Sequence, residues 1–451
     1  MLDRLRHPLA AVVAALLLTV PFLVTYVTHG FHLSPEPPGA NIAPSVAVLV
    51  GGLAILGASF LLAWGAETAE KDVPTAFAIA VLAVLAVAPE YAVDAYYAWQ
   101  AGANPGSGQA GLAVANMTGA NRILIGIGWA GIALFTVYRA KRVGDSAVEH
   151  RSGLLADRVT LDRAIATEIA FLLAATAFAF FVPLGGTIGI LDTAVLVGLY
   201  VLYIGIIIRG DVEETDEHVG VPAYFQEFSK GPRIAVVLFL FAYSGLLIYI
   251  AVHPFATGLE RLGLQYGIPE FFMVQWLAPL ASESPELVVV AYLVNKARST
   301  AGFNALISSK LNQWTLLIGT LAVVYSIAAG HVGGLPLSEK QTAEIWITAA
   351  QSFFALAILA NFSISAREAI ALFLLFASQV AAEFYVIQTV GEPAATNISI
   401  TILYVYTVVY VLLGVGLFVL HRESVRELFG RTAANAQEAM GTEASQPERA
   451  D

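Results

Sequence analysis

The sequence predicts an all-α, polytopic membrane protein of about twelve transmembrane helices, arranged as two inverted repeats. Three observations lead to this prediction. Only 13% of the 451 residues are charged and 58% are hydrophobic, whereas soluble proteins carry about a quarter charged residues. Apolar segments of roughly 20 residues, long enough to cross a bilayer, recur along the whole chain. A proline followed directly by a glutamate lies in the middle of two of these segments.

The apolar segments are joined by short connections rich in glycine, proline and charge, which leave no room for a soluble domain between them. The first segment follows Arg4 and Arg6 and has the length of a bilayer span, so we expect an uncleaved helix; a signal peptide is the alternative. The predicted spans are 9–28, 43–64, 73–99, 111–138, 160–182, 189–208, 233–253, 270–294, 301–329, 344–362, 367–390 and 396–420.

Lysine and arginine fall almost entirely on one side of the membrane when these spans alternate in direction. Because cytoplasmic loops carry the excess of basic residues, this side is the cytoplasmic one, and both termini are expected there, in a multi-pass protein of the cell membrane. Only Arg261 and Lys340 fall on the outer side, and Arg122 and Lys310 fall within spans. The basic residues assigned to the cytoplasmic side are Arg4, Arg6, Lys71, Arg139, Lys141, Arg142, Arg151, Arg158, Arg163, Arg209, Lys230, Arg233, Lys296, Arg298, Arg367, Arg422, Arg426, Arg431 and Arg449.

The composition also excludes several classes of chemistry. The chain has no cysteine, so disulfides, thiolate metal sites and thiol nucleophiles are ruled out. A net charge of −11 on so apolar a chain argues against nucleic acid as a partner. No cofactor is expected, and the expected partners are the lipid bilayer and inorganic cations. The oligomeric state cannot be predicted from the sequence.

Two proline–glutamate pairs identify the repeats. Pro89-Glu90 lies in span 73–99 and Pro285-Glu286 lies in span 270–294. Proline frees a backbone carbonyl within a helix, and a carboxylate inside the membrane indicates function. The two spans run in opposite directions, so the repeats are inverted, which is typical of transporters with a site at the midplane.

The residues around these pairs resemble the alpha-repeats of the calcium/cation antiporter superfamily, which includes the sodium/calcium exchangers. The family pattern is G-[TS]-S-x-P-E followed by G-N-x-x-G-S-N-x-x-N. The first copy here has Leu85 to Glu90 and then Ala115 to Asn121; the second has Ala281 to Glu286 and then Asn304, Ser308 and Asn312. The resemblance implies a ten-helix exchanger core with one additional helix at each end.

The resemblance divides the chain into six parts. An additional N-terminal helix and outer loop occupy 1–42, and an additional C-terminal helix occupies 391–421. The cytoplasmic parts are an acidic loop at 209–232 and a tail at 422–451. The first exchanger half spans 43–208 with its repeat at 73–138, and the second spans 233–390 with its repeat at 270–329.

The resemblance and the buried acids together give a set of candidate ligands for a hard cation, because such ions prefer carboxylate and neutral oxygen donors. Glu283 precedes Glu286 by three residues and Asp94 follows Glu90 by four, so each pair shares a helix face. For the polar residues of the following helices, bonding between helices is the alternative to ligation. The expected metal ligands are Glu90, Asp94, Asn116, Asn121, Ser282, Glu283, Glu286, Asn304, Ser308 and Asn312.

Several positions depart from the family pattern. Ala86 and Val87 replace small hydroxyl residues, and Leu124 replaces an asparagine. Arg122 and Lys310 occupy equivalent positions in the two repeats and are possible tethered cations that neutralise Glu90, Asp94, Glu283 or Glu286. The alternative is that both lie beyond the site and pair locally.

These features predict secondary active antiport, with Ca²⁺ or a related cation exchanged for Na⁺ by alternating access at a midplane carboxylate site. The missing hydroxyls and the additional acid Glu283 leave H⁺-coupled exchange as an alternative. A cation channel fits less well, because inverted broken helices favour a carrier. An enzyme is not expected: an intramembrane metal-dependent transferase would need His ligands or an Asp-rich motif at helix ends, and the sequence shows neither.

Overall fold

The structure is a computed structural model that describes residues 7–29, 42–72, 88–143, 145–153, 155–209 and 220–440. Helices make up almost all of it, as the sequence predicts. The helices of the first half and the segment preceding it are α2 (Pro8–His29), α3 (Pro44–Ala69), α6 (Ala88–Ala103), α7 (Gln109–Ile123), α8 (Ala130–Val143), α9 (Ala166–Ala179) and α10 (Ile190–Arg209). Those that follow are α11 (Val221–Gln226), α12 (Lys230–Tyr266), α13 (Glu270–Asn295), α14 (Ser299–Asn312), α15 (Ile318–Ala329), α16 (Glu339–Leu359), α17 (Ala366–Thr389), α18 (Ala394–Leu420) and α19 (Arg422–Ala439).

Ten helices in the described ranges are long and apolar enough to cross a membrane, and α13 makes an eleventh if its two bent parts count as one span. The remaining predicted span, 73–99, lies partly outside the described residues, and α6 covers its second part. The predicted acidic stretch of the loop at 209–232 lies mostly outside the described residues, apart from the short helix α11. The protein is therefore a multi-pass membrane protein.

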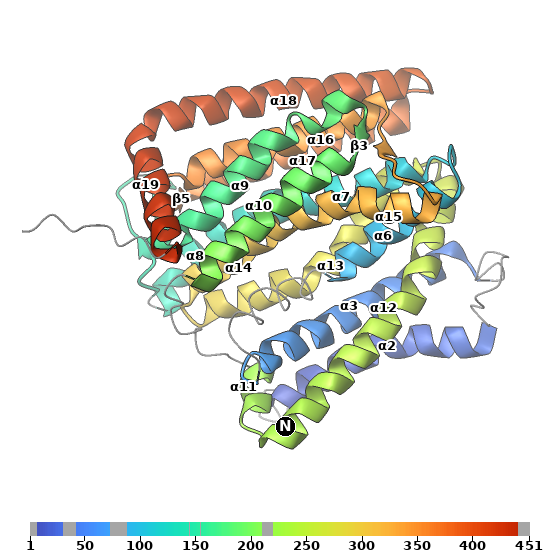
Figure 1. Ribbon diagram of the computed structural model, residues 1–451, viewed down its shortest axis with the longest axis horizontal. Helices are drawn as coiled ribbons and strands as arrows, with labels where there is room; N and C mark the ends of the chain where they lie inside the picture. The colour runs from blue at the N-terminus through green and yellow to red at the C-terminus, as the bar shows by residue number, and fades with distance from the viewer. Residues whose placement is uncertain are drawn as a thin grey trace, which may run out of the picture.

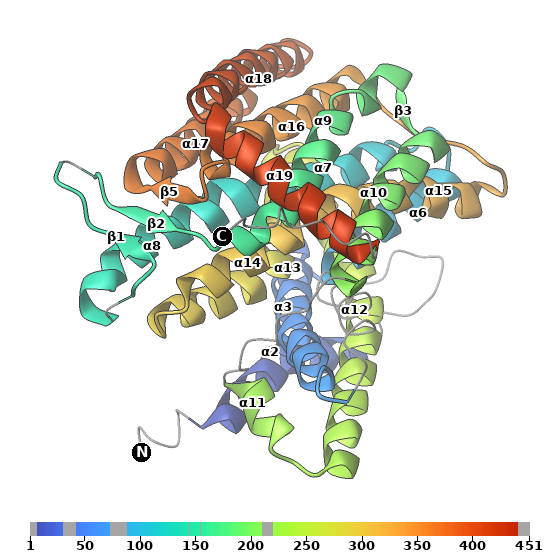
Figure 2. The ribbon, with the colours of Figure 1, turned by 60° about the vertical axis from the view of Figure 1, so that its left-hand side comes forward.

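The helices form two groups that Figures 1 and 2 show from different sides. Helices α2, α3 and α12 lie together below the larger group, which holds the repeats and is covered by α18. The helix α3 packs along α12, and α2 packs on α3. This arrangement follows from composition, because α2, α3 and α12 carry apolar residues all around and pack where small residues such as Gly51 and Gly258 let backbones approach.

The two halves are interlocked. The helix α6 packs on α15 of the second half, and α13 packs on α7 of the first. Two further pairs also join the halves: α10 of the first half contacts α15 of the second, and α17 of the second contacts α8 of the first. Each half therefore buries its apolar faces largely against the other half, as expected of inverted repeats.

Five short strands among the described residues are an addition that the all-α prediction did not include. The strand β2 (Arg158–Thr160) pairs antiparallel with β5 (Ser363–Ser365), and β1 (Val148–Glu149) pairs with β2. The strand β3 (Thr187–Ile188) pairs antiparallel with β4 (Leu335–Pro336). Both β2 and β4 precede a long helix, and both β5 and β3 lie between two helices, so the sheets are equivalent in the two halves. They lie at opposite ends of the molecule, β5 near α19 and β3 at the far end (Figure 1).

Both repeats also contain a π-helical turn at the same point. The segment η2 (Leu124–Trp129) connects α7 to α8, and η5 (Gln313–Leu317) connects α14 to α15. Such turns are rare and frequently occur at functional sites. Their recurrence supports the alignment of the repeats.

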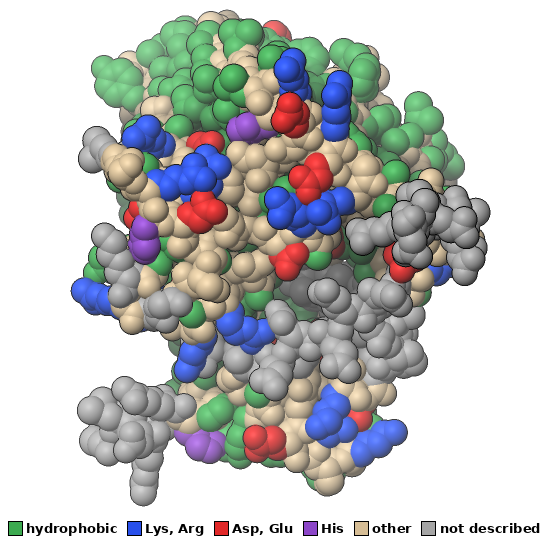
Figure 3. Space-filling model, turned by 90° about the vertical axis from the view of Figure 1, so that its left-hand side faces the viewer, with side chains coloured by type: hydrophobic (Ala, Val, Ile, Leu, Met, Phe, Trp, Pro, Cys, Tyr) green, Lys and Arg blue, Asp and Glu red, His purple; other side chains and the backbone are tan. Residues whose placement is uncertain are grey.

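The end of the molecule near α19 differs from its flanks. Lysine, arginine, aspartate and glutamate side chains are spread across this end, while hydrophobic side chains gather on the flank above it (Figure 3). The ion pairs Arg163–Glu427 and Arg431–Glu427 belong to this exposed surface. A charged end and an apolar flank are what a protein needs when its helices run across a bilayer.

Candidate cation site

The first part of the candidate site lies on α6. Glu90 and Asp94 are both buried, with 3% and 1% of their surface exposed. The side-chain amide of Asn116, on α7, donates to Asp94 Oδ1 at 2.9 Å. The helix spacing of four residues brings both carboxylates to one face, and α7 supplies a neutral oxygen beside them.

The second part lies on α13, which bends by 49° between Ser284 and Glu286. Pro285 lies between these two residues in the sequence, and a proline removes one backbone hydrogen bond from a helix. Glu283 is buried and Glu286 is partly exposed. The sequence signal that singled out this helix therefore corresponds to a broken helix at the site.

The helix α14 and the π-helical turn after it hold the two carboxylates of α13. Ser309 Oγ donates to Glu286 Oε2 at 2.8 Å, and Gln313 Nε2 donates to Glu283 Oε1 at 2.6 Å. Neither Ser309 nor Gln313 is among the residues expected from the sequence. Ser308 is one of the expected ligands, and it lies near the Tyr203 hydroxyl of α10.

The carboxylates of the two repeats lie close enough to interact electrostatically. Glu90 contacts the Ser282 hydroxyl and interacts electrostatically with Glu286 and Asp94. Glu283 interacts electrostatically with both Glu90 and Glu286. Three carboxylates from two helices of opposite direction thus form one cluster, which we call the carboxylate cluster (Glu90, Glu283 and Glu286).

Several buried oxygens in and around this cluster accept no hydrogen bond from the described residues. Buried polar atoms without a partner are uncommon in folded proteins, and all of these are oxygen acceptors of the type that hard cations bind. No group of three or more histidine, aspartate or glutamate side chains in the described ranges is arranged to hold a metal ion, so a cation bound here would need neutral oxygens as ligands. The oxygens are Glu90 Oε2, Asp94 Oδ2, Asn116 Oδ1, Glu283 Oε2, Asn304 Oδ1 and Gln313 Oε1.

The remaining expected ligands lie on α7 and α14. Asn121 is fully buried, and its side-chain amide donates to the Met117 carbonyl at 2.8 Å. Asn312 is buried and Asn304 partly so. Lys310 Nζ donates to Asn121 Oδ1 at 2.6 Å and interacts electrostatically with Glu283, which brings this lysine to the edge of the cluster.

Arg122 occupies a different environment from Lys310, although the two residues hold equivalent positions in the two repeats. Its Nη1 lies 3.0 Å from Glu344 Oε2, and its other nitrogens contact Gln351 and Gln379. The guanidinium carbon lies 5.1 Å from the centre of the Trp276 ring. Arg122 therefore pairs locally, with a glutamate that sequence reasoning did not single out.

Glu344 belongs to a second buried polar cluster between α7, α13, α16 and α17. Lys340 bridges Glu344, at 3.1 Å, and Glu383, and Gln275 donates to Glu344 at 2.8 Å. Two cations and two carboxylates give this cluster no net charge. We call it the neutral cluster (Arg122, Lys340, Glu344 and Glu383). The repeated Pro-Glu pattern does not identify this cluster in the sequence, because its members come from helices with no shared motif.

The chain is similar to known proteins in both sequence and fold. The sequence profile of the family described as "Sodium/calcium exchanger protein" matches residues 44–209 and 236–385, which is more than half of the chain. The chain belongs to the sodium/calcium exchanger protein family. No curated protein sequence matches it.

Two solved structures extend the comparison. The exchanger-family chain is 41% identical to the crystal structure of an H⁺/Ca²⁺ exchanger, CAX, with a TM-score of 0.81, and the match covers 95% of this chain and 98% of that one. It is also similar in fold to the Ca²⁺/H⁺ antiporter YfkE, at 14% identity and a TM-score of 0.56, covering 83% and 98% of the two chains. Membership in this family makes the protein a transporter of inorganic cations by antiport, and not an enzyme.

Proposed function

We propose that the protein exchanges Ca²⁺ for H⁺, with both ions competing for the carboxylate cluster. The observation that carries the proposal is the set of buried oxygens without hydrogen-bond donors, contributed by both repeats. A hard divalent cation satisfies such oxygens, and carboxylates provide the charge that binds it. The 41% identity to an H⁺/Ca²⁺ exchanger supports Ca²⁺ as the substrate.

The sequence predicts Na⁺ as the counter-ion, with H⁺ as the alternative, whereas two observations favour H⁺. The identity to the H⁺/Ca²⁺ exchanger holds over nearly the whole chain. In addition, the neutral oxygens of Asn121, which would serve a Na⁺ ion, accept hydrogen bonds from Lys310. Na⁺ remains the second candidate because the family profile includes sodium exchangers.

In this proposal Glu90, Glu283 and Glu286 bind Ca²⁺ in their ionised form and release it when they take up protons. The helix α6 supplies Glu90 and the bent helix α13 supplies the other two, so both repeats change their contacts with the ion together. Asp94, Asn116, Ser282, Asn304 and Asn312 supply further oxygens around the cluster, whereas the Asn121 oxygens accept from Lys310. Alternating access then requires the site to open to one side of the membrane at a time. We place the protein in the cell membrane, with both termini in the cytoplasm.

The test is ⁴⁵Ca²⁺ uptake into proteoliposomes under an imposed H⁺ gradient, an imposed Na⁺ gradient, or neither. We expect uptake under the H⁺ gradient that saturates with Ca²⁺, and its loss in Glu286→Gln. Glu423→Gln, an exposed position on α19, is the matched control and should transport normally. Uptake under the Na⁺ gradient alone would instead support sodium exchange, and uptake without any gradient dependence would support a channel.

A further inference from the structure

Lys310 lies in an environment that a monovalent cation would occupy. The residue is fully buried on α14. Its Nζ donates to Asn121 Oδ1 at 2.6 Å and to the Asn121 carbonyl at 3.3 Å, both on α7 of the other repeat. Nζ also lies 4.4 Å from the centre of the Trp314 ring, which favours a cation there.

The carboxylate cluster lies on the other side of this amine. Glu283 interacts electrostatically with Lys310, and Gln313, one turn after Lys310, donates to Glu283. Backbone carbonyls coordinate Na⁺ in transporters, and amide and carboxylate oxygens are donors of the same hard type. Here those donors contact a side chain that cannot leave the protein.

The equivalent cation of the first repeat plays no such part. Arg122 pairs with Glu344 in the neutral cluster. The two repeats are therefore asymmetric at this position, and only the second places its cation beside the carboxylates.

We propose that Lys310 takes the place of a Na⁺ ion at the site and thereby excludes Na⁺ as the counter-ion. The inference rests on the proposed function and specifies its coupling ion. With Lys310 in place, Na⁺ finds no free neutral oxygens at Asn121, while protons still reach the carboxylates. The lysine is thus a specificity-determining residue for the exchange.

The test compares wild type, Lys310→Gln and Lys310→Arg in proteoliposomes, with ⁴⁵Ca²⁺ uptake driven by H⁺ or Na⁺ gradients. We expect wild type to respond to H⁺ alone, and Lys310→Gln to gain Na⁺-driven uptake by about tenfold or more. Lys310→Arg, which keeps a cation, should gain none. Lys310→Gln that keeps H⁺-driven uptake and gains no response to Na⁺ would overturn the inference.

A second measurement uses wild type alone and therefore tests the inference even if Lys310→Gln does not fold. In wild type, 100-fold excess Na⁺ over Ca²⁺ should leave ⁴⁵Ca²⁺ binding unchanged relative to choline, and strong competition by Na⁺ would contradict the inference. Failure of the proposed function is a separate outcome, because wild type would then show no gradient-driven Ca²⁺ uptake at all.

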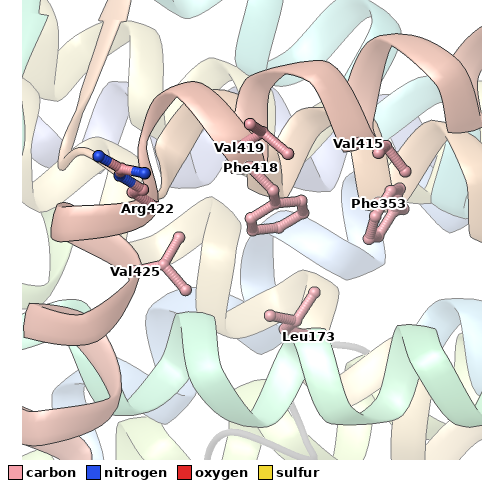
Figure 4. A pocket seen from close by; sticks show the side chains of 7 residues that line it. All are labelled: Leu173, Phe353, Val415, Phe418, Val419, Arg422 and Val425. Carbon is pink, nitrogen blue, oxygen red and sulfur yellow. The ribbon is translucent and has the colours of Figure 1, made fainter.

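An independent observation concerns the lipid-facing surface. A cavity of about 450 Å³ lies between α9, α16, α18 and α19. Figure 4 shows its lining, which is almost wholly apolar, with Arg422 at its edge: Leu173, Phe353, Val415, Phe418, Val419, Arg422 and Val425. Arg422 is exposed and comes two residues after the end of α18, a helix long and apolar enough to cross a membrane.

We infer that the cavity binds an anionic phospholipid of the surrounding bilayer. The acyl chain fits the apolar lining, and the headgroup phosphate fits Arg422, since basic residues at the ends of transmembrane helices bind lipid headgroups. The hydrocarbon lining favours a lipid over a free phosphate, which would contact only the arginine.

Native mass spectrometry of the protein in mixed phosphatidylglycerol and phosphatidylcholine tests this inference. We expect retained phosphatidylglycerol in wild type, and about a fivefold or greater loss in Arg422→Gln and in Val415→Trp, which fills the cavity. Arg431→Gln, whose partner is Glu427 on the same helix, is the control and should retain the lipid. Equal retention of both lipids by wild type, or an unchanged ratio in both variants, would overturn the inference.

Discussion

Gly119 of α7 lies directly against the Gln275 backbone carbonyl of α13, so closely that a Cβ at residue 119 would come within 1.8 Å of that oxygen. The contact joins the helix that carries Asn116 and Asn121 to the helix that carries Glu283 and Glu286. Small residues at crossings of membrane helices allow such close approach. The distance between the two repeats therefore depends on the absence of a side chain at this one position.

Gly119→Ala should separate α7 from α13 and reduce both stability and transport. Because the added carbon meets backbone rather than a flexible side chain, we expect a loss of about 1–3 kcal/mol in the free energy of unfolding, as in overpacked cores. Thermal unfolding in detergent, followed by tryptophan fluorescence, measures it. Gly131→Ala on α8, where a Cβ meets nothing within 4 Å, is the control; an equal effect of both substitutions would contradict the prediction.

The ion pair between Arg122 and Glu344 should stabilise the larger helix group. Both side chains are fully buried, and removing one partner of a buried pair costs about 3–5 kcal/mol. We expect Arg122→Met to lower the free energy of unfolding by an amount of this order, and the double variant Arg122→Met/Glu344→Gln to lose less than the sum of the single ones. Arg431→Met, which removes an exposed pair, should change it by about 0.5 kcal/mol or less.

Ser309 and Ser308 should differ in their effect on Ca²⁺ transport. Ser309 Oγ donates to Glu286 Oε2, whereas Ser308 lies near Tyr203. Loss of a hydrogen bond to a charged group is worth about 1.5–3 kcal/mol, so Ser309→Ala should change the KM for Ca²⁺ by about tenfold or more. Ser308→Ala should leave it nearly unchanged, and the reverse order of effects would show that Ser308 faces the ion.

This pair of serines separates what the sequence predicts from what it does not: it predicts the helices of the site, but not which side chain on a helix faces the carboxylates. Hydropathy and charge predicted the spans, and the Pro-Glu pairs identified the helices α6 and α13, because both signals are local along the chain. Which of two adjacent serines faces a carboxylate depends on how the helix α14 is rotated against α13, and this rotation is set by packing between helices rather than by the local sequence. Arg122 and Lys310 illustrate the same limit, since equivalent positions in the repeats acquire different partners from helices distant in sequence.

Asp72 and Arg233 give the protein a pH-dependent contribution to stability. Arg233 Nε and Nη2 donate to the two Asp72 oxygens, both at 2.6 Å, just after α3 and at the start of α12. The Arg233 hydrogen bonds hold the pKa of Asp72 below its usual value, against the opposing effect of burial. The stabilising contribution is therefore complete above the unfolded pKa, about 3.9, and is lost as the pH falls toward the folded pKa.

Thermal unfolding of wild type and Asp72→Asn between pH 3 and pH 7 measures this contribution. The Tm difference between them should be constant above about pH 5 and should shrink at lower pH. Glu423→Gln, a change on the exposed surface of α19, is the control and should show a smaller difference from wild type. A Tm difference between wild type and Asp72→Asn that grows as the pH falls would contradict the assignment.

The two small sheets bear on how such a chain arose. Strand β2 of the first half pairs with β5 of the second, and β4 of the second pairs with β3 of the first, so neither half alone completes a sheet. An ancestral half-length chain could have formed the same pairings only with a second copy of itself inserted in the opposite direction. Duplication and fusion would then have fixed one copy in each orientation, after which single positions, such as Arg122 and Lys310, were free to diverge.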